Sequence, residues 1–305
     1  MRLQYAFLVP VMLSAAALPA RAQVALDWKL KEGDRFYLVT ESTFNQVMEL
    51  PGKEAGKEIK QEITQTAVLQ FLVEKKLPDG GYSIKQTIEC LMIKGGANPP
   101  VTDDKIQGAK FTLTLNPKLE VVKLEDYNEF IKKLAGDDPA ALKTIKSIVT
   151  EELLTKAATQ AFAFLPTKQV KEGDEWGKER SIKMPLGPLG SMEVTNLYKY
   201  AGKGKVNDKE YDKITFTSDV AYSLPKEDAG IAFRVVKGAL KADNAKGTIY
   251  FDSASGRLVQ YEMALNLTAD LTLSINSVPL ETKITKQEQT VKVTVHTENP
   301  ITKPK

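Results

Sequence analysis

The feature of this sequence that most constrains its fold is a long, unbroken alternation near the C-terminus. Apolar side chains occupy every second position from Val259 to Ile275, which indicates one β-strand with a single buried face. Ordinary strands contain about 3 to 10 residues, whereas this segment would extend roughly 55 Å at about 3.3 Å per residue. So long a strand must twist and curl, or bend at a bulge, around something apolar.

The same period of two residues predicts strands over most of the remaining chain. The fold class predicted is α+β, mainly antiparallel β, with long curved sheets from two related halves wrapped on a central helical segment. Strands are expected at 36–50, 63–73, 82–92, 111–115, 119–121, 192–200, 214–222, 231–235, 248–251 and 291–295.

A helical period replaces this alternation in the middle of the chain. Apolar residues recur every three or four positions, which predicts a short helix over 125–134 and a longer amphipathic helix over 138–164. Asp138 can accept hydrogen bonds from the first turn, Pro139 suits the first helical position, and Pro166 ends the segment. The longer helix needs a cover for its apolar face.

The first 22 residues have the composition of a signal peptide. Arg2 is followed by the uncharged stretch 6–18, and Ala20-Arg21-Ala22 fits cleavage before Gln23. The stretch is shorter than the roughly 20 residues that span a bilayer. We therefore expect an exported protein, periplasmic or extracellular, with no integral membrane span after cleavage. Cys90 is the only cysteine, so no intramolecular disulfide is expected.

A short motif occurs twice and suggests an internal duplication. Lys31-Glu32-Gly33-Asp34 recurs as Lys171-Glu172-Gly173-Asp174, and both copies precede similar strand patterns. A turn is the favoured role, because Gly adopts backbone conformations denied to other residues and Asp satisfies turn N–H groups. The alternative is a duplicated carboxylate site formed by Asp34 and Asp174. The predicted divisions are a signal peptide (1–22), a first β-rich half (23–124), a helical connector (125–166), a second β-rich half (167–298) and a tail (299–305).

The segment Phe164–Trp176 contains the pattern Leu-Pro-x-Lys-x-Val-x-x-Gly-Asp-x-Trp. It resembles the signature of an uncharacterised family of exported bacterial proteins of about this length. That family has no assigned activity, so the resemblance implies no catalytic residues. More distantly, long curved strands with a helical plug are similar to the half-barrel of periplasmic lipoprotein carriers, which is an analogy of architecture only.

The sequence lacks the residue patterns of most known catalytic and metal sites. His296 is the only histidine and lies in the final strand; with one His and one Cys, the usual zinc ligand sets cannot be assembled. Lys and Arg total 42 against 39 Asp and Glu, which argues against a nucleic-acid partner. We predict no catalytic residue, no metal site and no cofactor.

The preferred hypothesis is an exported, non-enzymatic binding protein for a lipid or another apolar ligand. A curved sheet would enclose a hollow partly filled by the 138–164 helix, with few polar groups to orient the ligand. The alternative for its lining residues is a fully packed core. A structural or protein-interaction module of the cell envelope is the second hypothesis, and a carboxylate-dependent hydrolase is the third. The lining candidates are Tyr261, Met263, Leu265, Leu267, Leu271, Phe162 and Phe164.

Overall fold

The computed structural model describes residues 23–49, 56–95, 101–102, 105–225, 233–276 and 278–301. The predicted signal peptide lies outside these residues. Within them, all strands belong to one 13-stranded antiparallel sheet with the order β6-β5-β3-β2-β1-β13-β12-β11-β10-β9-β7, with β4 on β3 and β8 on β9. The strands are β1 (Arg35–Glu49), β2 (Glu58–Lys76), β3 (Tyr82–Gly95), β4 (Val101–Thr102), β5 (Lys110–Leu115), β6 (Val121–Glu125), β7 (Glu175–Trp176), β8 (Ser181–Pro185), β9 (Ser191–Val206), β10 (Lys209–Ser223), β11 (Phe233–Asp252), β12 (Arg257–Ile275) and β13 (Val278–His296).

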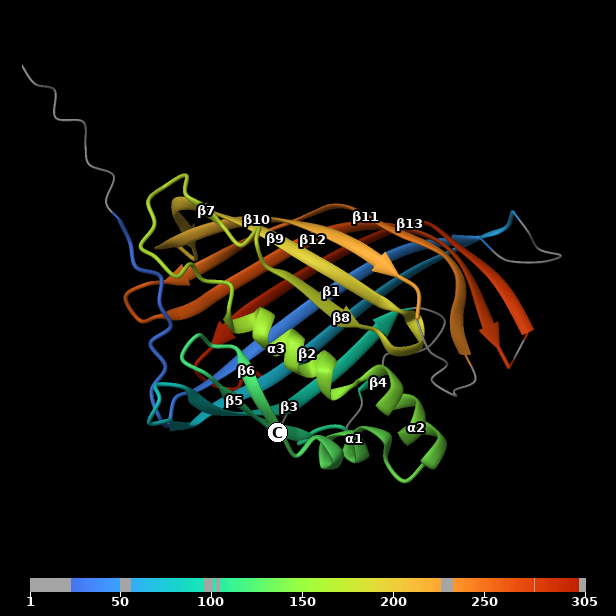
Figure 1. Cartoon of the computed structure of the whole chain (residues 1–305), viewed down its shortest axis with the longest axis horizontal. Coiled ribbons are helices and arrows are strands. Elements are labelled where there is room, and N and C mark those ends of the chain that lie inside the picture. Colours follow the sequence, from blue (N-terminus) through green and yellow to red (C-terminus); the bar gives the residue numbers. More distant parts are fainter. Residues whose placement is uncertain are drawn as a thin grey trace, which may run out of the picture.

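The mainly antiparallel β class is confirmed, but the two halves do not form separate sheets. β1, the first strand of the chain, pairs with β13, the last, from Tyr37↔His296 to Glu49↔Lys283. Because this pairing joins the halves, the sheet is continuous from β6 to β7. It curves into a long half-closed shell (Figure 1).

The long alternating segment forms one strand, as predicted. β12 runs from Arg257 to Ile275, and its register against β13 shifts between Leu267 and Ala269. A bulge of this kind increases the local twist and bends a strand. The length of β12 is therefore accommodated by curvature.

Three helices connect the halves: α1 (Tyr127–Ala135), α2 (Pro139–Ile148) and α3 (Glu151–Phe162). The prediction of a single helix over 138–164 is wrong, because the chain breaks at Val149 and restarts at Thr150. The Thr150 side chain accepts a hydrogen bond from the Leu153 N–H at 3.1 Å and caps α3. Asp138 caps α2 as expected, accepting from the Ala140 N–H at 2.8 Å.

Helix α3 lies in the gap between the two margins of the curved sheet (Figure 1). It contacts β6 on one side and β8 on the other. The edge strand β6 has a backbone N–H without a strand partner at Val121, and this group donates to Thr159 Oγ1 of α3 at 3.1 Å. The helix thus covers an edge that would otherwise be open to pairing.

Residues 23–34, here called the cap segment, cross one end of the shell (Figure 1, dark blue). In this segment Val24 pairs with Val170, the Lys29 N–H donates to the Gly256 carbonyl at 3.1 Å, and the last residues bond to β2. Gly256 has φ of 65°, and a Cβ there would lie 2.4 Å from the Lys29 nitrogen. Only glycine permits this close approach.

The repeated Lys-Glu-Gly-Asp motif forms the same turn twice. The Gly33 N–H donates to the Val73 carbonyl of β2 at 2.8 Å, and the Gly173 N–H donates to the Tyr200 carbonyl of β9 at 2.9 Å. Asp34 and Asp174 each accept from the N–H of the lysine three residues earlier. Since five strands separate β2 from β9, the two carboxylates do not form one site.

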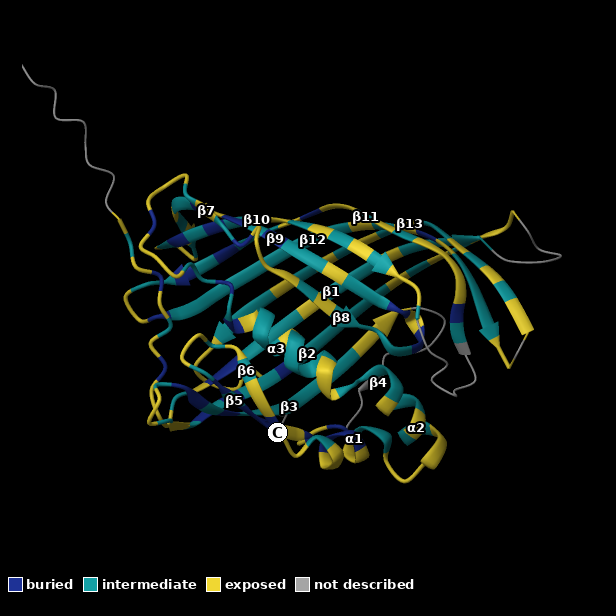
Figure 2. Ribbon diagram, in the orientation of Figure 1, coloured by how far each residue is buried: buried dark blue, intermediate teal, exposed yellow. Residues whose placement is uncertain are grey.

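Two clusters of buried side chains form the core, one in each half. Isoleucines from equivalent strands lie at their centres: Ile84 of β3 and Ile214 of β10 both have 0% exposure. Trp28 of the cap segment packs against both clusters. Burial is greatest near the cap segment and decreases toward the far hairpin ends (Figure 2).

Candidate functional site

A cavity of about 440 Å³ lies between the inner face of the sheet and α3. Its walls come from both halves of the chain, because β1 and β13 adjoin at its floor. It is lined mostly by apolar side chains from the cap segment, from α3 and the residues just after it, and from seven strands. They include Trp28, Phe36, Leu38, Phe71, Ala157, Ala161, Phe162, Phe164, Met192, Val194, Phe216, Val220, Ala242, Ala245, Ile249, Leu258, Tyr261, Met263, Leu265, Leu267, Val293 and Val295.

Most of the residues proposed from the sequence meet at this cavity. Phe162, Phe164, Tyr261, Met263, Leu265 and Leu267 line it. Leu271 does not; it lies farther along β12, opposite Gly238 and Thr282.

Sequence reasoning missed Trp28 and the alanines of α3. Trp28 precedes the first strand and belongs to no periodic segment. Ala157 and Ala161 are small residues on a helix whose larger neighbours dominated the pattern. A small residue signals a cavity only when its surroundings are known, so the sequence alone offered no clear indication of these positions.

Aromatic rings close the end of the cavity beneath the cap segment. The Trp28 ring centroid lies 5.6 Å from Phe162, 5.8 Å from Phe164 and 5.5 Å from Phe251. The Trp28 indole N–H donates to the Phe162 carbonyl at 2.9 Å, in the last turn of α3, where carbonyls lack helical partners. This end is therefore tightly packed.

Farther from the cap segment the chain does not fill its own interior. Ala157 and Ala161 line the cavity and are exposed, and the opposing Val194, Leu265 and Leu267 are only half-buried. Figure 2 shows much of the middle of the strands in teal, the colour of half-buried residues. Because α3 presents methyl groups where larger side chains would reach the sheet, apolar surface remains uncovered.

The ionisable hydroxyls of the cavity are neutral. Burial raises the pKa of Tyr198 to about 12, although the hydrogen bond from the Asn196 amide (3.0 Å) opposes the shift. Burial likewise raises the pKa of Tyr261, whose hydroxyl donates to Met263 Sδ at 3.3 Å. Arg257 also lines the cavity, but its guanidinium forms an ion pair with Asp34.

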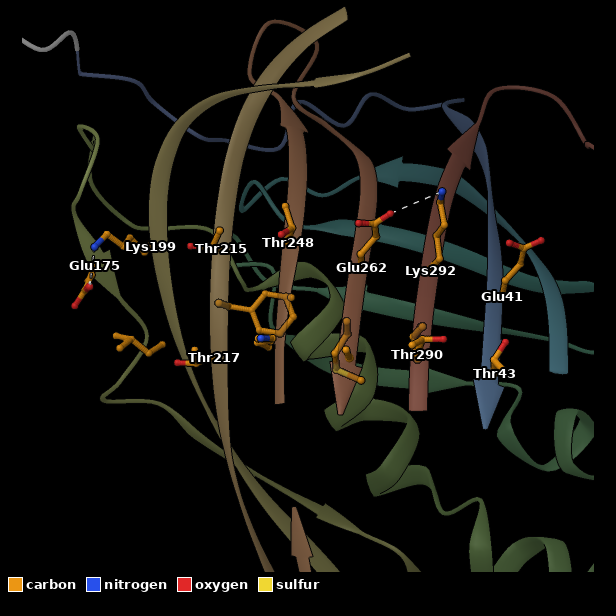
Figure 3. Close-up of a pocket in the computed structure, with 17 residues that line it drawn as sticks. Glu41, Thr43, Glu175, Lys199, Thr215, Thr217, Thr248, Glu262, Thr290 and Lys292 are labelled. Atoms are coloured by element: carbon orange, nitrogen blue, oxygen red, sulfur yellow. Dashed lines mark ion pairs between the residues drawn. The ribbon is translucent and has the colours of Figure 1, made fainter. Parts of the chain in front are cut away.

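A second hollow, of about 790 Å³, lies on the opposite face of the same strands (Figure 3). One cross-strand row there reads Lys199, Thr215, Thr248, Glu262, Lys292 and Glu41. Lys292 lies 3.7 Å from Glu262, and Lys199 lies 3.6 Å from Glu175. Its charged side chains are three lysines and three glutamates, so the positive and negative charges on this face of the sheet balance.

The described part of the chain contains no cluster of three or more His, Cys, Asp or Glu side chains able to hold a metal ion. His296 is exposed, with a ring nitrogen 3.0 Å from Thr294 Oγ1. None of the helices described is long and apolar enough to cross a bilayer. The apolar cavity between α3 and the sheet is the candidate site because of its own volume and lining.

Comparison with solved structures gives only weak similarity. A structure of lipovitellin that concerns its lipid–protein interactions matches with a TM-score of 0.37 and 8% identity over 90% of this chain and 26% of that one. DynF from the dynemicin biosynthesis pathway of Micromonospora chersina matches with a TM-score of 0.20 and 10% identity over 93% and 92% of the two chains. An outer membrane channel from Pseudomonas putida F1 matches with a TM-score of 0.24 and 9% identity over 89% of this chain and 98% of that one. At these TM-scores none of them indicates a function.

No functionally curated protein matches the chain significantly. A family model does match, over residues 97–278, which is more than half of the chain and includes the Phe164–Trp176 segment. The chain belongs to DUF6263, a family of unknown function.

Proposed function

We propose that this protein is an exported binding protein that holds a lipid or another apolar molecule in the cavity between α3 and the sheet. One observation carries the proposal: apolar side chains in the part of the 440 Å³ cavity away from Trp28, among them Val194, Leu265 and Leu267, remain half-exposed instead of packing against each other. Leaving apolar surface in water costs roughly 25 cal/mol per Å². An apolar ligand would remove that cost.

The dimensions and polarity of the cavity support the same proposal. Ligand sites in proteins have volumes of roughly 300 to 1,000 Å³, with apolar walls and a few polar groups that orient the ligand. The cavity falls within that range, and its polar side chains include Asn196, Ser218, Gln160 and Gln289. A fully packed core, the alternative for these residues, would leave no space of this size.

The proposal is tested with N-phenyl-1-naphthylamine, a neutral apolar dye that fluoresces when it leaves water. Ala161→Leu fills the cavity from α3, and Ala140→Leu makes the same change at an exposed alanine of α2 that does not line the cavity. We expect the dye to bind the wild type and Ala140→Leu equally. Ala161→Leu should bind it at least about tenfold more weakly, a loss of about 1.4 kcal/mol.

The melting temperature separates cavity filling from misfolding. Added methyl groups that pack against uncovered apolar surface should leave the melting temperature of Ala161→Leu unchanged or raise it. If the wild type does not bind the dye, or if Ala161→Leu binds it as well as the wild type does, the cavity is not a binding site.

The export part of the proposal rests on residues 1–22, with their positive start, apolar stretch and Ala-x-Ala cleavage pattern. The mature chain would begin at Gln23. Expression of the full chain in a bacterium, followed by fractionation and intact-mass measurement, should recover a periplasmic or secreted protein that begins at this residue. A cytoplasmic protein of full mass would contradict export without bearing on the cavity.

A further inference from the structure

The polar side chains on the inner face of the sheet carry information about the ligand beyond its apolar character. Along β13 the inner positions near the cap segment are Val295, Val293 and Val291, and the next two are Gln289 and Gln287. The change from valine to glutamine places neutral amides on an inner face where the neighbours of Gln289 across the strands, Phe44 and Leu265, are apolar.

Further glutamines lie on the same face of the neighbouring strands. Gln287 lies opposite Gln46 of β1, and Gln46 lies opposite Gln61 of β2. Residues directly opposite on one face of an antiparallel sheet are close neighbours. We name Gln46, Gln61, Gln287 and Gln289 the glutamine belt.

The belt is not used to hold the fold together. No hydrogen bond joins the side chain of any of its four members to another described residue, and the same holds for Gln160 of α3. Gln160 and Gln289 line the cavity itself. Each amide offers one acceptor oxygen and two N–H donors. A purely hydrocarbon ligand would expel water from these groups and leave them unpaired, which costs free energy.

The charged group of the cavity is already neutralised. Arg257 donates to the Gly256 carbonyl at 3.1 Å and forms its ion pair with Asp34, a residue of the first Lys-Glu-Gly-Asp turn. The ion pair is about three quarters buried on both sides, with side-chain exposures of 23% and 28%. An anionic headgroup entering here would meet the Asp34 carboxylate beside the guanidinium, so the cavity does not select for negative charge.

We propose, building on the proposed function, that the ligand is an uncharged amphiphile whose tail lies toward Trp28 and whose hydroxyl, ester or amide group hydrogen-bonds to Gln289 and Gln160. The apolar end of the cavity fits a hydrocarbon chain, and neutral amides fit a neutral polar group that can both donate and accept. The glutamine belt then continues the polar surface along the strands, away from the aromatic end.

The test uses two probes with the same tail, dodecanol and dodecanoate, each displacing N-phenyl-1-naphthylamine at pH 8, where the carboxylate is ionised. We expect dodecanol to bind the wild type at least about tenfold more tightly than dodecanoate does. In Gln289→Leu the affinity for dodecanol should fall about tenfold, which corresponds to about 1.4 kcal/mol, while the affinity for the dye stays the same or rises. Gln260→Leu is the matched control, because Gln260 of β12 lies on the opposite face of the sheet, outside the cavity. This variant should bind dodecanol and the dye as the wild type does.

The outcomes separate the two proposals. Dye binding that is lost in Ala161→Leu, together with dodecanoate binding as tightly as dodecanol, would retain the binding protein and overturn the uncharged ligand. Unchanged dodecanol affinity in a folded Gln289→Leu would also overturn it. Absence of dye, dodecanol and dodecanoate binding to the wild type would overturn the proposed function, and this inference with it.

Discussion

At the scale of single residues, Asp212 is the least expected feature of the core. Its carboxylate is 1% exposed in β10, among apolar side chains of the second half. The Tyr200 hydroxyl donates to Oδ1 at 2.7 Å, and the half-exposed Lys203 ammonium lies 2.8 Å from the same oxygen. Burial alone would raise the pKa of Asp212, but hydrogen bonds from Lys203, Ser253 and Tyr200 and the charge of Lys203 lower it on balance.

A lowered pKa makes Asp212 a source of pH-dependent stability. The folded state holds the ionised form more firmly than the unfolded chain, whose carboxyl has a pKa of 3.8. The stabilising contribution is therefore complete above that value and is lost as the pH falls through the lower folded pKa.

Replacing Asp212 by Asn should lower the free energy of unfolding by about 1 to 3 kcal/mol at pH 7, because the Tyr200 and Lys203 groups lose a charged acceptor. The difference from the wild type should shrink as the pH falls below about 3.8. Urea unfolding followed between pH 7 and pH 2.5 measures both effects. Asp219→Asn, on the exposed face of the same strand, is the control and should change stability little. A deficit that persists undiminished at pH 2.5 would show that the charge of Asp212 does not contribute.

At the scale of elements, α3 is held at its C-terminal end by two indoles from separate parts of the chain. The Trp28 N–H donates to the Phe162 carbonyl, and the Trp176 N–H donates to the Phe164 carbonyl, both at 2.9 Å. Carbonyls at this end of a helix have no intrahelical partner. Trp28 thus fixes the last turn of α3, and Trp176 fixes the chain two residues beyond it.

We expect Trp176→Phe to lower the free energy of unfolding by about 1 kcal/mol, the net value of one hydrogen bond, because the phenyl ring can still stack on Tyr198. Hydrogen exchange should show faster opening of the last turn of α3. Amides of β1 and β13, far from this contact in the strand order, provide the internal reference and should keep their protection. Equal loss of protection in α3 and in these strands would mean that Trp176 supports the whole fold rather than the helix end.

Elements were predictable from the sequence to different degrees, for physical reasons. Strands with one buried face have a strict period of two, so β12 and the hairpins of both halves could be recognised. The break at Val149 was missed, because the apolar stripe continues across it and the Thr150 cap depends on a single hydrogen bond. The pairing of β1 with β13 was also missed, since the contact joins residues that are distant in sequence and leaves no local pattern.

The candidate site shows the same limit. Six of its residues were named from periodicity, because long apolar strands and the end of an amphipathic helix identify the inner face. Whether that face encloses space depends on volume, which Ala157 and Ala161 decide on α3. That the side-chain amides of Gln160 and Gln289 have no hydrogen-bond partner among the described residues can be known only from the structure. Periodicity identifies a face, whereas a site needs three-dimensional complementarity.

At the scale of the whole molecule, the two halves repeat each other and yet share their structure. Each half begins with the same turn, and neighbouring strands follow chain order in both halves. Between domains that fold separately there are few contacts. Here the β1–β13 pairing and Trp28, which packs on both clusters, cross the boundary. We therefore predict that the halves unfold together.

The prediction is tested by weakening one half and measuring the other. Ile84 and Ile214 have 0% exposure at equivalent places in β3 and β10, and truncating either to Ala should cost about 2 to 5 kcal/mol. If unfolding is cooperative, Ile84→Ala lowers the protection of β10 amides in hydrogen exchange as much as that of β3 amides. Ile214→Ala likewise lowers the protection of β3 amides as much as that of β10 amides. The most protected amides of each strand report this free energy, because they exchange only when the whole unit opens. Loss confined to the mutated half would instead establish two independent domains on either side of the helices, and the cavity would then lie between them.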